Sequence, residues 1–524
     1  MAASADRPIM ANSGNRFDAI VIGSGIGGLA CACALTRSGL RVLVLEMHAA
    51  AGGLTQTFTR KGFTWAVGVH YLGDMGAGRP ARRMIDWLSG NAIQFAPSGA
   101  VYDTVHLPGG FEIQFARSQT ALVAELKEQF PASRAEIDAF FVALEEAARA
   151  GRALFEQRAM PTLLGKTLGL LNRSAVEKWW GRTTDAVLHE MIGDPLLRAV
   201  LAAQRGDYGP DPRESSFGMH ATVMHHYMNG AYFPIGGAGA FAKHLVPVIE
   251  RGGGEVRTAA PVLRILMEND MVAGVRLQDG TEERCPRVFS AIGARNTILK
   301  LLPVSVQQSE WAREITALRP SACHIGMYLG LEGDIRSRGA TSSNHWFYES
   351  LDITDALWRD PVHRLSAPAL YVTFPSLKHG NVDFPDEKPT AEIVAFTDWA
   401  TFSPWEKSHL GRRPADYAAL KETLSGLLLA QFARHFPALA PSVVHAELST
   451  PLSSVAYTAA EHGGVYGLEA SPRRFLSGAL RAKTPWPGLY LAGQDLTSAG
   501  IMGAMMGGVL SAAALEPKLL ARLI

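Results

Sequence analysis

The sequence lacks the features that mark several classes of protein. Its four cysteines, Cys31, Cys33, Cys285 and Cys323, form no CxxC pair, which argues against a redox disulfide or a zinc site. The formal net charge is only +1 and no basic run is present, which argues against nucleic-acid binding. The sequence therefore predicts neither a metal nor a nucleic-acid partner, and its cysteine usage favours a reducing, cytoplasmic setting.

Long apolar runs are also absent. The longest uncharged stretch that could be mistaken for a membrane span, residues 499–515, is rich in glycine and alanine, and we predict a buried core helix there. Residues 1–16 are small and polar and lack the apolar core of a signal peptide, so a disordered tail is expected. The remaining composition, 47% hydrophobic and 19% charged over 524 residues, indicates a folded chain of more than one domain.

A glycine-rich turn near the start of the chain is its most informative motif. An apolar run over residues 18–22 leads into Gly23, Gly25 and Gly28, which open a helix of small residues predicted over 29–40. This is the dinucleotide fingerprint, in which the glycines allow a tight turn, close approach of a pyrophosphate and helix–strand packing. The next apolar strand, 41–45, ends in Glu46, which is placed to accept hydrogen bonds from a ribose diol.

Two further motifs separate FAD from NAD. The pair Gly52-Gly53 follows the acidic residue, and a strand, an acid and a small-residue helix follow one another over 486–508. Both resemble motifs of the glutathione-reductase-like flavoenzymes, and that resemblance implies an FAD whose ring lies over the helix start near Gly500. The cofactor-binding residues predicted in this way are Gly23, Gly25, Ile26, Gly27, Gly28, Glu46, Met47, Gly52, Gly53, Leu54, Val262, Gly493, Asp495, Gly500, Ile501 and Met502.

The predicted fold is α/β, with a Rossmann-type FAD domain and a discontinuous α+β substrate domain. We assign 17–75, 233–310 and 470–524 to the FAD domain, with a helix over 240–250 and strands over 260–267, 272–277 and 287–291. The resemblance implies that the first of these strands offers Val262 to adenine. Residues 76–232 and 311–469 are left for the substrate domain. The glycines at 236–239 lack a preceding strand, so no separate NAD(P)H site is predicted.

The segment 154–187 combines leucines, Trp179-Trp180 and interspersed lysines and arginines. Such a helix suits either a peripheral membrane contact or packing on its own domain, and the sequence leaves both open.

The complete set of motifs resembles the retinol saturase and carotenoid isomerase branch of the phytoene desaturase-like flavoproteins. The Gly-x-His-Tyr-x-Gly portion at 68–73 looks more like retinol saturases than like bacterial phytoene desaturases. This resemblance implies an FAD-dependent oxidoreductase that saturates, desaturates or isomerises C=C bonds of a lipophilic polyene or isoprenoid. It does not identify the substrate or the electron donor or acceptor. The blocks that carry the resemblance are 52–73, 216–220, 225–234, 450–452, 464–467 and 488–508.

Hydride transfer to an alkene needs a proton for the second carbon. His70 and Tyr71 form one candidate group of proton donors, and His225, His226 and Tyr227 form a second. Each could equally be a buried structural residue. Two other functions stay open on the same fold, namely a flavin amine oxidase and a prenyl-lipid carrier that does not use FAD; the intact fingerprint argues against the carrier.

Overall fold

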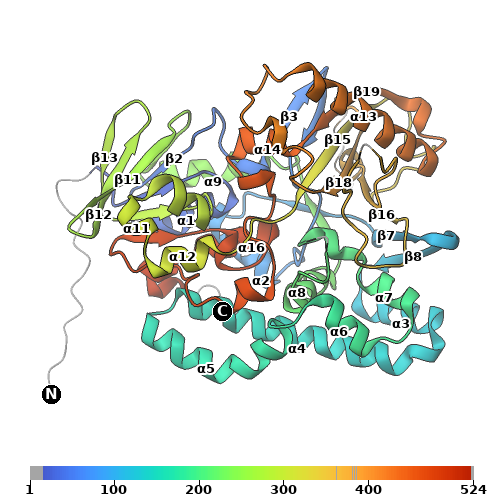
Figure 1. The fold of residues 1–524 in the computed structure, drawn as a ribbon, viewed down its shortest axis with the longest axis horizontal. Helices are drawn as coiled ribbons and strands as arrows, with labels where there is room; N and C mark the ends of the chain where they lie inside the picture. Colours follow the sequence, from blue (N-terminus) through green and yellow to red (C-terminus); the bar gives the residue numbers. More distant parts are fainter. Residues whose placement is uncertain are drawn as a thin grey trace.

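The computed structural model describes residues 16–520, apart from Pro210, Val362, Asn381, Asp383 and Pro385, so the predicted tail lies outside the described residues except for its last position. A five-stranded parallel sheet, in the order β10-β2-β1-β14-β20, occupies the left part of the molecule in Figure 1. Its strands are β1 (Ala19–Ile22), β2 (Val42–Leu45), β10 (Glu255–Arg257), β14 (Val288–Ser290) and β20 (Leu489–Leu491).

Helices of small residues pack closely on this sheet. Helix α1 (Ile26–Arg37) lies against α16 (Gly500–Leu515) and α9 (Ala240–Arg251). A Cβ atom on Gly27 would lie 2.8 Å from the Cα of Gly493 and 2.9 Å from the carbonyl oxygen of Ala504, so the two helices can approach this closely only through glycine. The uncharged stretch 499–515 is therefore mostly the buried helix α16, as its composition predicts.

The structure corrects the predicted strand pattern in one place. Strands β11 (Val262–Glu268), β12 (Met271–Leu277) and the unpredicted β13 (Glu282–Arg284) form the antiparallel insert. The third strand predicted for this insert, 287–291, instead contributes β14 to the parallel sheet beside β1. The reason is that β14 is buried along its whole length, as a central parallel strand must be, whereas the polar β13 suits the insert. Helix α1 also begins three residues earlier than predicted.

A second, mixed sheet lies on the other side of the molecule, in the order β19-β15-β18-β17-β16-β7-β8. All its neighbours are antiparallel except β7 and β16. Its strands are β7 (Val101–Leu107), β8 (Phe111–Ala116), β15 (Cys323–Leu331), β16 (Asn344–Tyr348), β17 (Ala369–Thr373), β18 (Thr390–Thr397) and β19 (Val443–Ser449). Smaller sheets use β3 (Thr57–Arg60), β4 (Phe63–Ala66), β5 (Leu72–Gly73), β6 (Phe95–Pro97) and β9 (Ala231–Pro234).

Helices α3 to α7 line one edge of the molecule, along the bottom of Figure 1. The helices not yet given are α2 (Pro80–Ser89), α3 (Gln119–Gln129), α4 (Arg134–Ala159), α5 (Thr162–Trp179), α6 (Thr184–Met191), α7 (Pro195–Leu201), α8 (Phe217–Tyr227), α10 (Ala294–Asn296), α11 (Val304–Gln307), α12 (Glu310–Thr316), α13 (Ala415–His435), α14 (Pro451–Thr458) and α15 (Pro472–Leu476).

Helix α5 falls in the segment considered for membrane contact. Trp179 at its end and the following Trp180 are both buried, and the Trp180 indole N–H donates to the Ala147 carbonyl at 2.9 Å, so neither lies at a surface. Four leucines on the same helix are instead exposed, namely Leu164, Leu168, Leu170 and Leu171. In the described part of the chain, no helix is both long and apolar enough to cross a membrane.

Candidate active site

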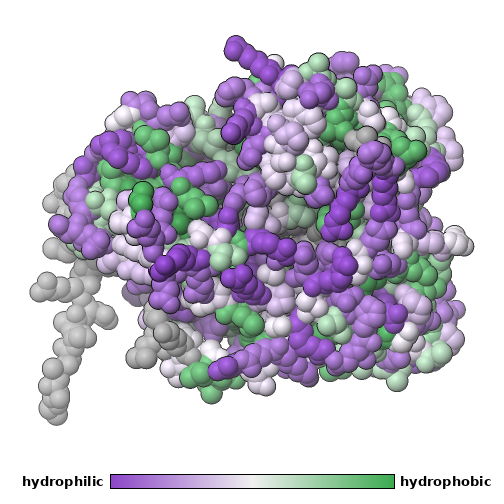
Figure 2. Space-filling model, in the orientation of Figure 1, coloured by the Kyte–Doolittle hydropathy of each residue, from purple (hydrophilic) through white to green (hydrophobic). Residues whose placement is uncertain are grey.

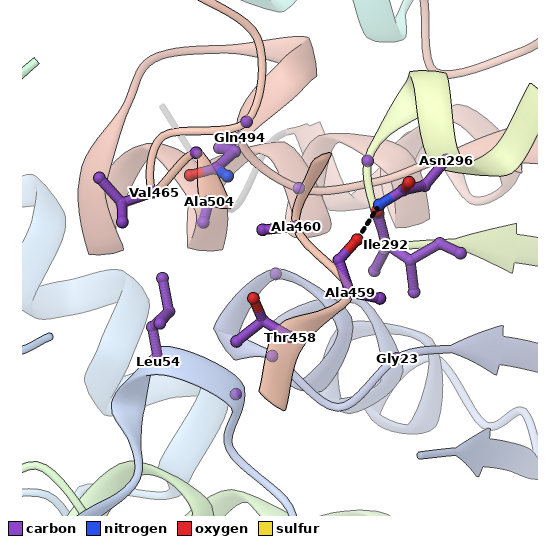
Figure 3. A pocket seen from close by; sticks show the side chains of 18 of the residues that line it. Gly23, Leu54, Ile292, Asn296, Thr458, Ala459, Ala460, Val465, Gln494 and Ala504 are labelled. Atoms are coloured by element: carbon purple, nitrogen blue, oxygen red, sulfur yellow. Dashed lines mark hydrogen bonds between the residues drawn. The ribbon is translucent and has the colours of Figure 1, made fainter. Parts of the chain in front are cut away.

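A cavity of about 610 Å³ extends from the parallel sheet to the face of the mixed sheet. Its walls include Glu46 and Val262 beside the parallel sheet, and His324, Val394 and Phe396 on the mixed sheet. In Figure 3 the Gly23 turn faces the segment from Thr458 to Ala460. The side-chain amide of Asn296 donates a hydrogen bond to the Ala459 carbonyl oxygen at 3.0 Å and so holds this segment in place. The volume lies in the range usual for sites that enclose a small molecule.

Most of the predicted cofactor residues line this cavity. They are Gly23, Gly25, Ile26, Gly27, Glu46, Met47, Gly53, Leu54, Val262, Gly493, Asp495, Gly500 and Ile501. Gly28, Gly52 and Met502 are not among the lining residues. A Cβ on Gly28 would collide with the Gly23 carbonyl oxygen, which is the packing role expected of that glycine, and the Gly52 N–H donates to the Ser24 carbonyl at 3.1 Å.

The glycine turns fit the pyrophosphate and ring of an FAD. A Cβ atom on Gly25, Gly493 or Gly500 would meet no protein atom within 4 Å, so all three leave open space, and all three line the cavity. Helices α1 and α16 both begin at this open space. Their N-terminal N–H groups and partial positive charge therefore face the position of the cofactor. These glycines would hold the phosphates, and the start of α16 would lie beside the ring.

The Glu46 carboxylate is 7% exposed and already holds the turn together. Its Oε2 accepts hydrogen bonds from the Ser24 N–H at 2.9 Å and the Ser24 hydroxyl at 2.6 Å, and its Oε1 accepts one from the His48 N–H at 2.8 Å. A carboxylate has about four acceptor positions, which leaves one for a ribose hydroxyl. Asp495 plays a related part, because it accepts hydrogen bonds from Ala294 N–H at 2.7 Å and Leu468 N–H at 2.9 Å.

His70 is the one predicted proton donor that lines the cavity. Its ring Nδ1 lies 3.0 Å from Oε2 of Glu392, although the angle is not that of a hydrogen bond. Glu392 is 1% exposed and is held in place because its Oε1 accepts the Ala66 N–H at 2.9 Å. His324 also lines the cavity, but burial, with a smaller contribution from His70, lowers its pKa to about 4, so it is neutral at neutral pH.

Tyr71 lies behind His70 in a buried polar cluster. Its hydroxyl donates to Asp207 at 2.6 Å and lies 3.3 Å from an oxygen of Asp103. Lys378 donates to the His70 carbonyl oxygen at 2.8 Å and also contacts Asn344. Burial raises the pKa of Asp103 to about 6 and lowers the pKa of Lys378 to about 7.

The second predicted group lies away from the cavity wall. His226 accepts the Gly73 N–H at 2.8 Å, and burial lowers its pKa to about 4. His225 is 3.2 Å from Glu145. Tyr227 stacks on Tyr71 with ring centroids 4.4 Å apart. None of these three side chains lines the cavity, in contrast to His70.

Known proteins resemble this chain over almost its whole length. Residues 26–327 match the family described as "Flavin containing amine oxidoreductase". An all-trans-retinol 13,14-reductase of Danio rerio is 34% identical over 94% of this chain and 85% of its own. The chain belongs to the flavin-containing amine oxidoreductase family. It is an FAD-dependent oxidoreductase of α/β fold, and the resemblance inferred from its sequence is confirmed.

More distant proteins show how widely this flavoprotein fold is used. A chloroplastic prolycopene isomerase of Arabidopsis thaliana is 24% identical over 95% of this chain and 82% of its own. The solved structure of cyclohexylamine oxidase from Brevibacterium oxydans covers 96% of this chain and 99% of its own with a TM-score of 0.62, at 17% identity. That structural likeness concerns the fold alone.

Several residues that line the cavity were not predicted from the sequence. Gly293 and Asn296 follow β14, which had been assigned to the insert, and so went unnoticed. His324, Val394 and Phe396 come from mixed-sheet strands that carry no motif. Tyr466 could have been found, since it lies within the block 464–467 that supported the family resemblance.

Proposed function

We propose that this flavoenzyme reduces a C=C bond in a lipophilic polyene, with His70 as the proton donor. Reduced FAD, when bound, supplies a hydride from N5. The proposal draws on the Danio rerio relative, named for retinol reduction, and on the Arabidopsis thaliana relative, named for prolycopene isomerisation. The observation that carries it is a histidine backed by a buried carboxylate in the wall of a largely apolar cavity.

The mixed sheet supplies the apolar wall that a polyene needs. Val394 and Phe396 alternate along β18 with Ile393 and Ala395, which are buried on the other face of the sheet, and His324 lies opposite Phe396 in the neighbouring strand β15. Tyr466 also lines this wall. Its hydroxyl donates a hydrogen bond to the Gly206 carbonyl oxygen at 2.9 Å, so that proton is not offered to the substrate. These side chains bind hydrocarbon and exclude water, which protects the reduced cofactor from side reactions.

Glu392 positions His70. The carboxylate is buried and its Oε2 lies 3.0 Å from Nδ1, so this side of the imidazole ring faces Glu392. The other ring nitrogen, Nε2, then remains to deliver a proton. Because His324 is neutral at neutral pH, it is a poor competitor for this role.

The test is anaerobic reoxidation of the photoreduced enzyme by a panel of polyene alcohols and hydrocarbons, with products analysed for deuterium after reaction in D2O. We expect His70→Gln to slow reoxidation by about 10²–10⁴ while FAD content is kept, and Glu392→Gln to have a smaller effect. His189→Gln is the matched control, since His189 is half exposed on α6. Wild-type rates in His70→Gln would refute the assignment of His70.

Two other outcomes would overturn the reaction itself. Product isomers formed without net reoxidation of the flavin would make the enzyme an isomerase. Reduction of the oxidised enzyme by a primary amine would make it an amine oxidase, as the cyclohexylamine oxidase fold allows.

We also propose that α5 contacts a membrane surface, from which a lipophilic substrate could enter. Leu164, Leu168, Leu170 and Leu171 are between 37% and 82% exposed, and apolar side chains gather at the lower left of Figure 2, where Figure 1 places α5. Such a one-sided apolar helix suits the interface of a bilayer. The leucines carry this proposal, because the nearby cations Arg173 and Lys178 are paired with Glu177 and Glu146.

Sedimentation with phosphatidylcholine vesicles tests this contact. We expect the wild-type protein to sediment and a variant with Leu168→Ser, Leu170→Ser and Leu171→Ser to remain in the supernatant. Val304→Ser, a single exposed apolar residue on α11, is the control. Equal sedimentation of all three proteins would refute the membrane contact and leave the proposed reaction untouched.

A further inference from the structure

Two buried arginines hold the turn that connects β20 with α16. Arg158 lies in the last turn of α4, which passes beside α16 in Figure 1, and it is 4% exposed. Arg474 lies in α15 and is fully buried. The turn leads from Gly493 to Gly500, and both glycines line the cavity, whereas neither arginine does. The two guanidinium groups therefore lie directly behind the part of the wall that we assign to FAD.

The contacts of Arg158 are all with backbone carbonyl groups. It donates hydrogen bonds to the Leu496 carbonyl oxygen at 3.0 Å and to the Phe475 carbonyl oxygen at 2.8 Å, with a longer one of 3.4 Å to Arg474. Leu496 belongs to the turn, and Phe475 belongs to α15. Through this one side chain, α4 of the predicted substrate domain is connected to the flavin wall.

Arg474 holds the same turn from the other side. It donates to the carbonyl oxygens of Gln494 and of Thr497, the latter at 3.2 Å, and to that of Leu468 at 2.6 Å. Together with the Leu496 contact, three carbonyl oxygens of the turn are bound by guanidinium groups. They are thereby directed away from the cavity, where a carbonyl oxygen would repel an anionic cofactor.

The positive charge of Arg158 has no counter-charge in its surroundings. Within the described residues, no carboxylate comes within ion-pair distance of it. Its pKa is lowered to about 9 by burial, which is the largest cause, and by the neighbouring charges of Arg474 and Arg481, so it remains protonated at neutral pH. Arg474 differs, because Asp495 and Glu469 offset its charge from a longer distance. Burying an unpaired charge is costly, and such a cost is expected at functional sites.

The end of α4 accounts for only part of this positive charge. Arg481 donates to the Gln157 and Met160 carbonyl oxygens at 3.0 and 2.8 Å, and so binds the C-terminus of the helix. A helix C-terminus carries about half an elementary negative charge, which does not balance Arg481 and Arg158 together. Arg158 therefore leaves an excess of positive charge beside the turn.

We propose that Arg158 is a positioning residue that favours the reduced form of FAD, because it places an unneutralised positive charge behind the turn over residues 493–497. Reduced flavin carries more negative charge at its N1/O2 edge than oxidised flavin, so a fixed positive charge stabilises it more. The midpoint potential of the bound flavin is raised as a result. This inference requires that the protein binds FAD, and it is independent of the proposed substrate and of His70.

The test is a spectroscopic redox titration of the holoenzyme against a reference dye, which gives the ratio of the Kd values of oxidised and reduced FAD. Arg158→Gln keeps an N–H donor for the Leu496 carbonyl but removes the charge, whereas Arg158→Lys keeps the charge. We expect Arg158→Gln to reduce the preference for reduced FAD about tenfold, which lowers the midpoint potential by about 30 mV for a two-electron couple. Arg158→Lys should retain most of the wild-type potential.

Arg198→Gln is the matched control. Arg198 is half-buried on α7, outside the cavity, and it also donates only to carbonyl oxygens, those of Ile192 at 2.7 Å and Gly193 at 2.9 Å. Its replacement removes one positive charge and similar contacts at a different place. The midpoint potential of this variant should equal that of the wild-type protein.

Several outcomes would overturn this role of Arg158. An unchanged potential in Arg158→Gln would exclude it, and equal losses in Arg158→Gln and Arg158→Lys would show that packing matters instead of charge. An equal loss in Arg198→Gln would show that the effect is not local. FAD content and thermal midpoint show whether each variant is folded. If Arg158→Gln does not fold, the wild-type holoenzyme decides the question, because a potential at or below that of free FAD contradicts the proposal.

Discussion

Replacing Glu46 by glutamine tests the cofactor site without changing its shape. In the wild-type protein the two carboxylate oxygens accept three hydrogen bonds from Ser24 and His48, and one acceptor position remains for a ribose hydroxyl. Glutamine offers one oxygen and one NH2 group. Whichever way the amide is turned, its NH2 group faces a protein donor on one side, so at least one of these bonds is lost.

The size of the effect follows from this count. A hydrogen bond to a charged acceptor contributes about 1.5–3 kcal/mol and one to a neutral acceptor about 0.5–1.5 kcal/mol. One ribose bond weakened by about 1.4 kcal/mol raises the Kd for FAD about tenfold. A donor left unpaired beside the amide costs the protein a further ~1–3 kcal/mol of folding free energy, so the apoprotein should also unfold at a lower temperature.

Titration of the apoprotein with FAD, followed by quenching of flavin fluorescence, measures the first effect, and the thermal midpoint without FAD measures the second. Glu250→Gln is the matched control, because Glu250 is exposed at the end of α9. An unchanged Kd in Glu46→Gln, with the fold intact, would show that Glu46 makes no hydrogen bond to the cofactor.

Two further predictions concern packing and pH. Gly28→Val should abolish soluble, flavin-containing protein, because its Cβ would collide with the Gly23 carbonyl oxygen. The control Gly39→Ala lies in open space beyond α1 and should give soluble protein that retains FAD, although its positive φ of 91° costs some stability. Soluble Gly28→Val protein that contains flavin would contradict this packing argument. His220 is fully buried and its pKa is lowered to about 3, chiefly by burial, so its stabilising contribution is complete above pH 6.5 and is lost as the pH falls from about 6.5 towards 3. Free energies of unfolding measured across this window should fall less steeply in His220→Gln than in the wild-type protein, by at most about 1.4 kcal/mol per pH unit, and parallel curves would refute this.

The cofactor half of the fold could be predicted because its chemistry is local in the sequence. Gly23, Gly28 and Glu46 lie in one strand–helix–strand unit, and each spacing follows from a contact within that unit. The closing helix α16 also has a local signature, its small residues. Even here β13 and β14 were confused, because a short apolar strand does not reveal which of two adjacent sheets it joins.

The substrate half could not be predicted in the same way, because pairing between distant strands creates it. Trp346 and Tyr371 meet only because β16 and β17 pair in one register, and a shift by one residue would turn both rings to the opposite face. Arg205 reaches them from a short helix more than a hundred residues earlier in the chain. No motif or residue spacing in the sequence predicts that these three side chains lie together.

The proposed proton donor, His70, is held by contacts from both halves of the molecule. His70 lies on the segment that leaves the cofactor motif, yet its carbonyl is held by Lys378 and its ring faces Glu392, both from the mixed-sheet region. Burial lowers the pKa of Lys378 to about 7, so the hydrogen bond that fixes the His70 backbone weakens as that lysine loses its proton. A change confined to the strands around Glu392 would therefore leave the glycine cradle intact while removing the geometry proposed for protonating an alkene.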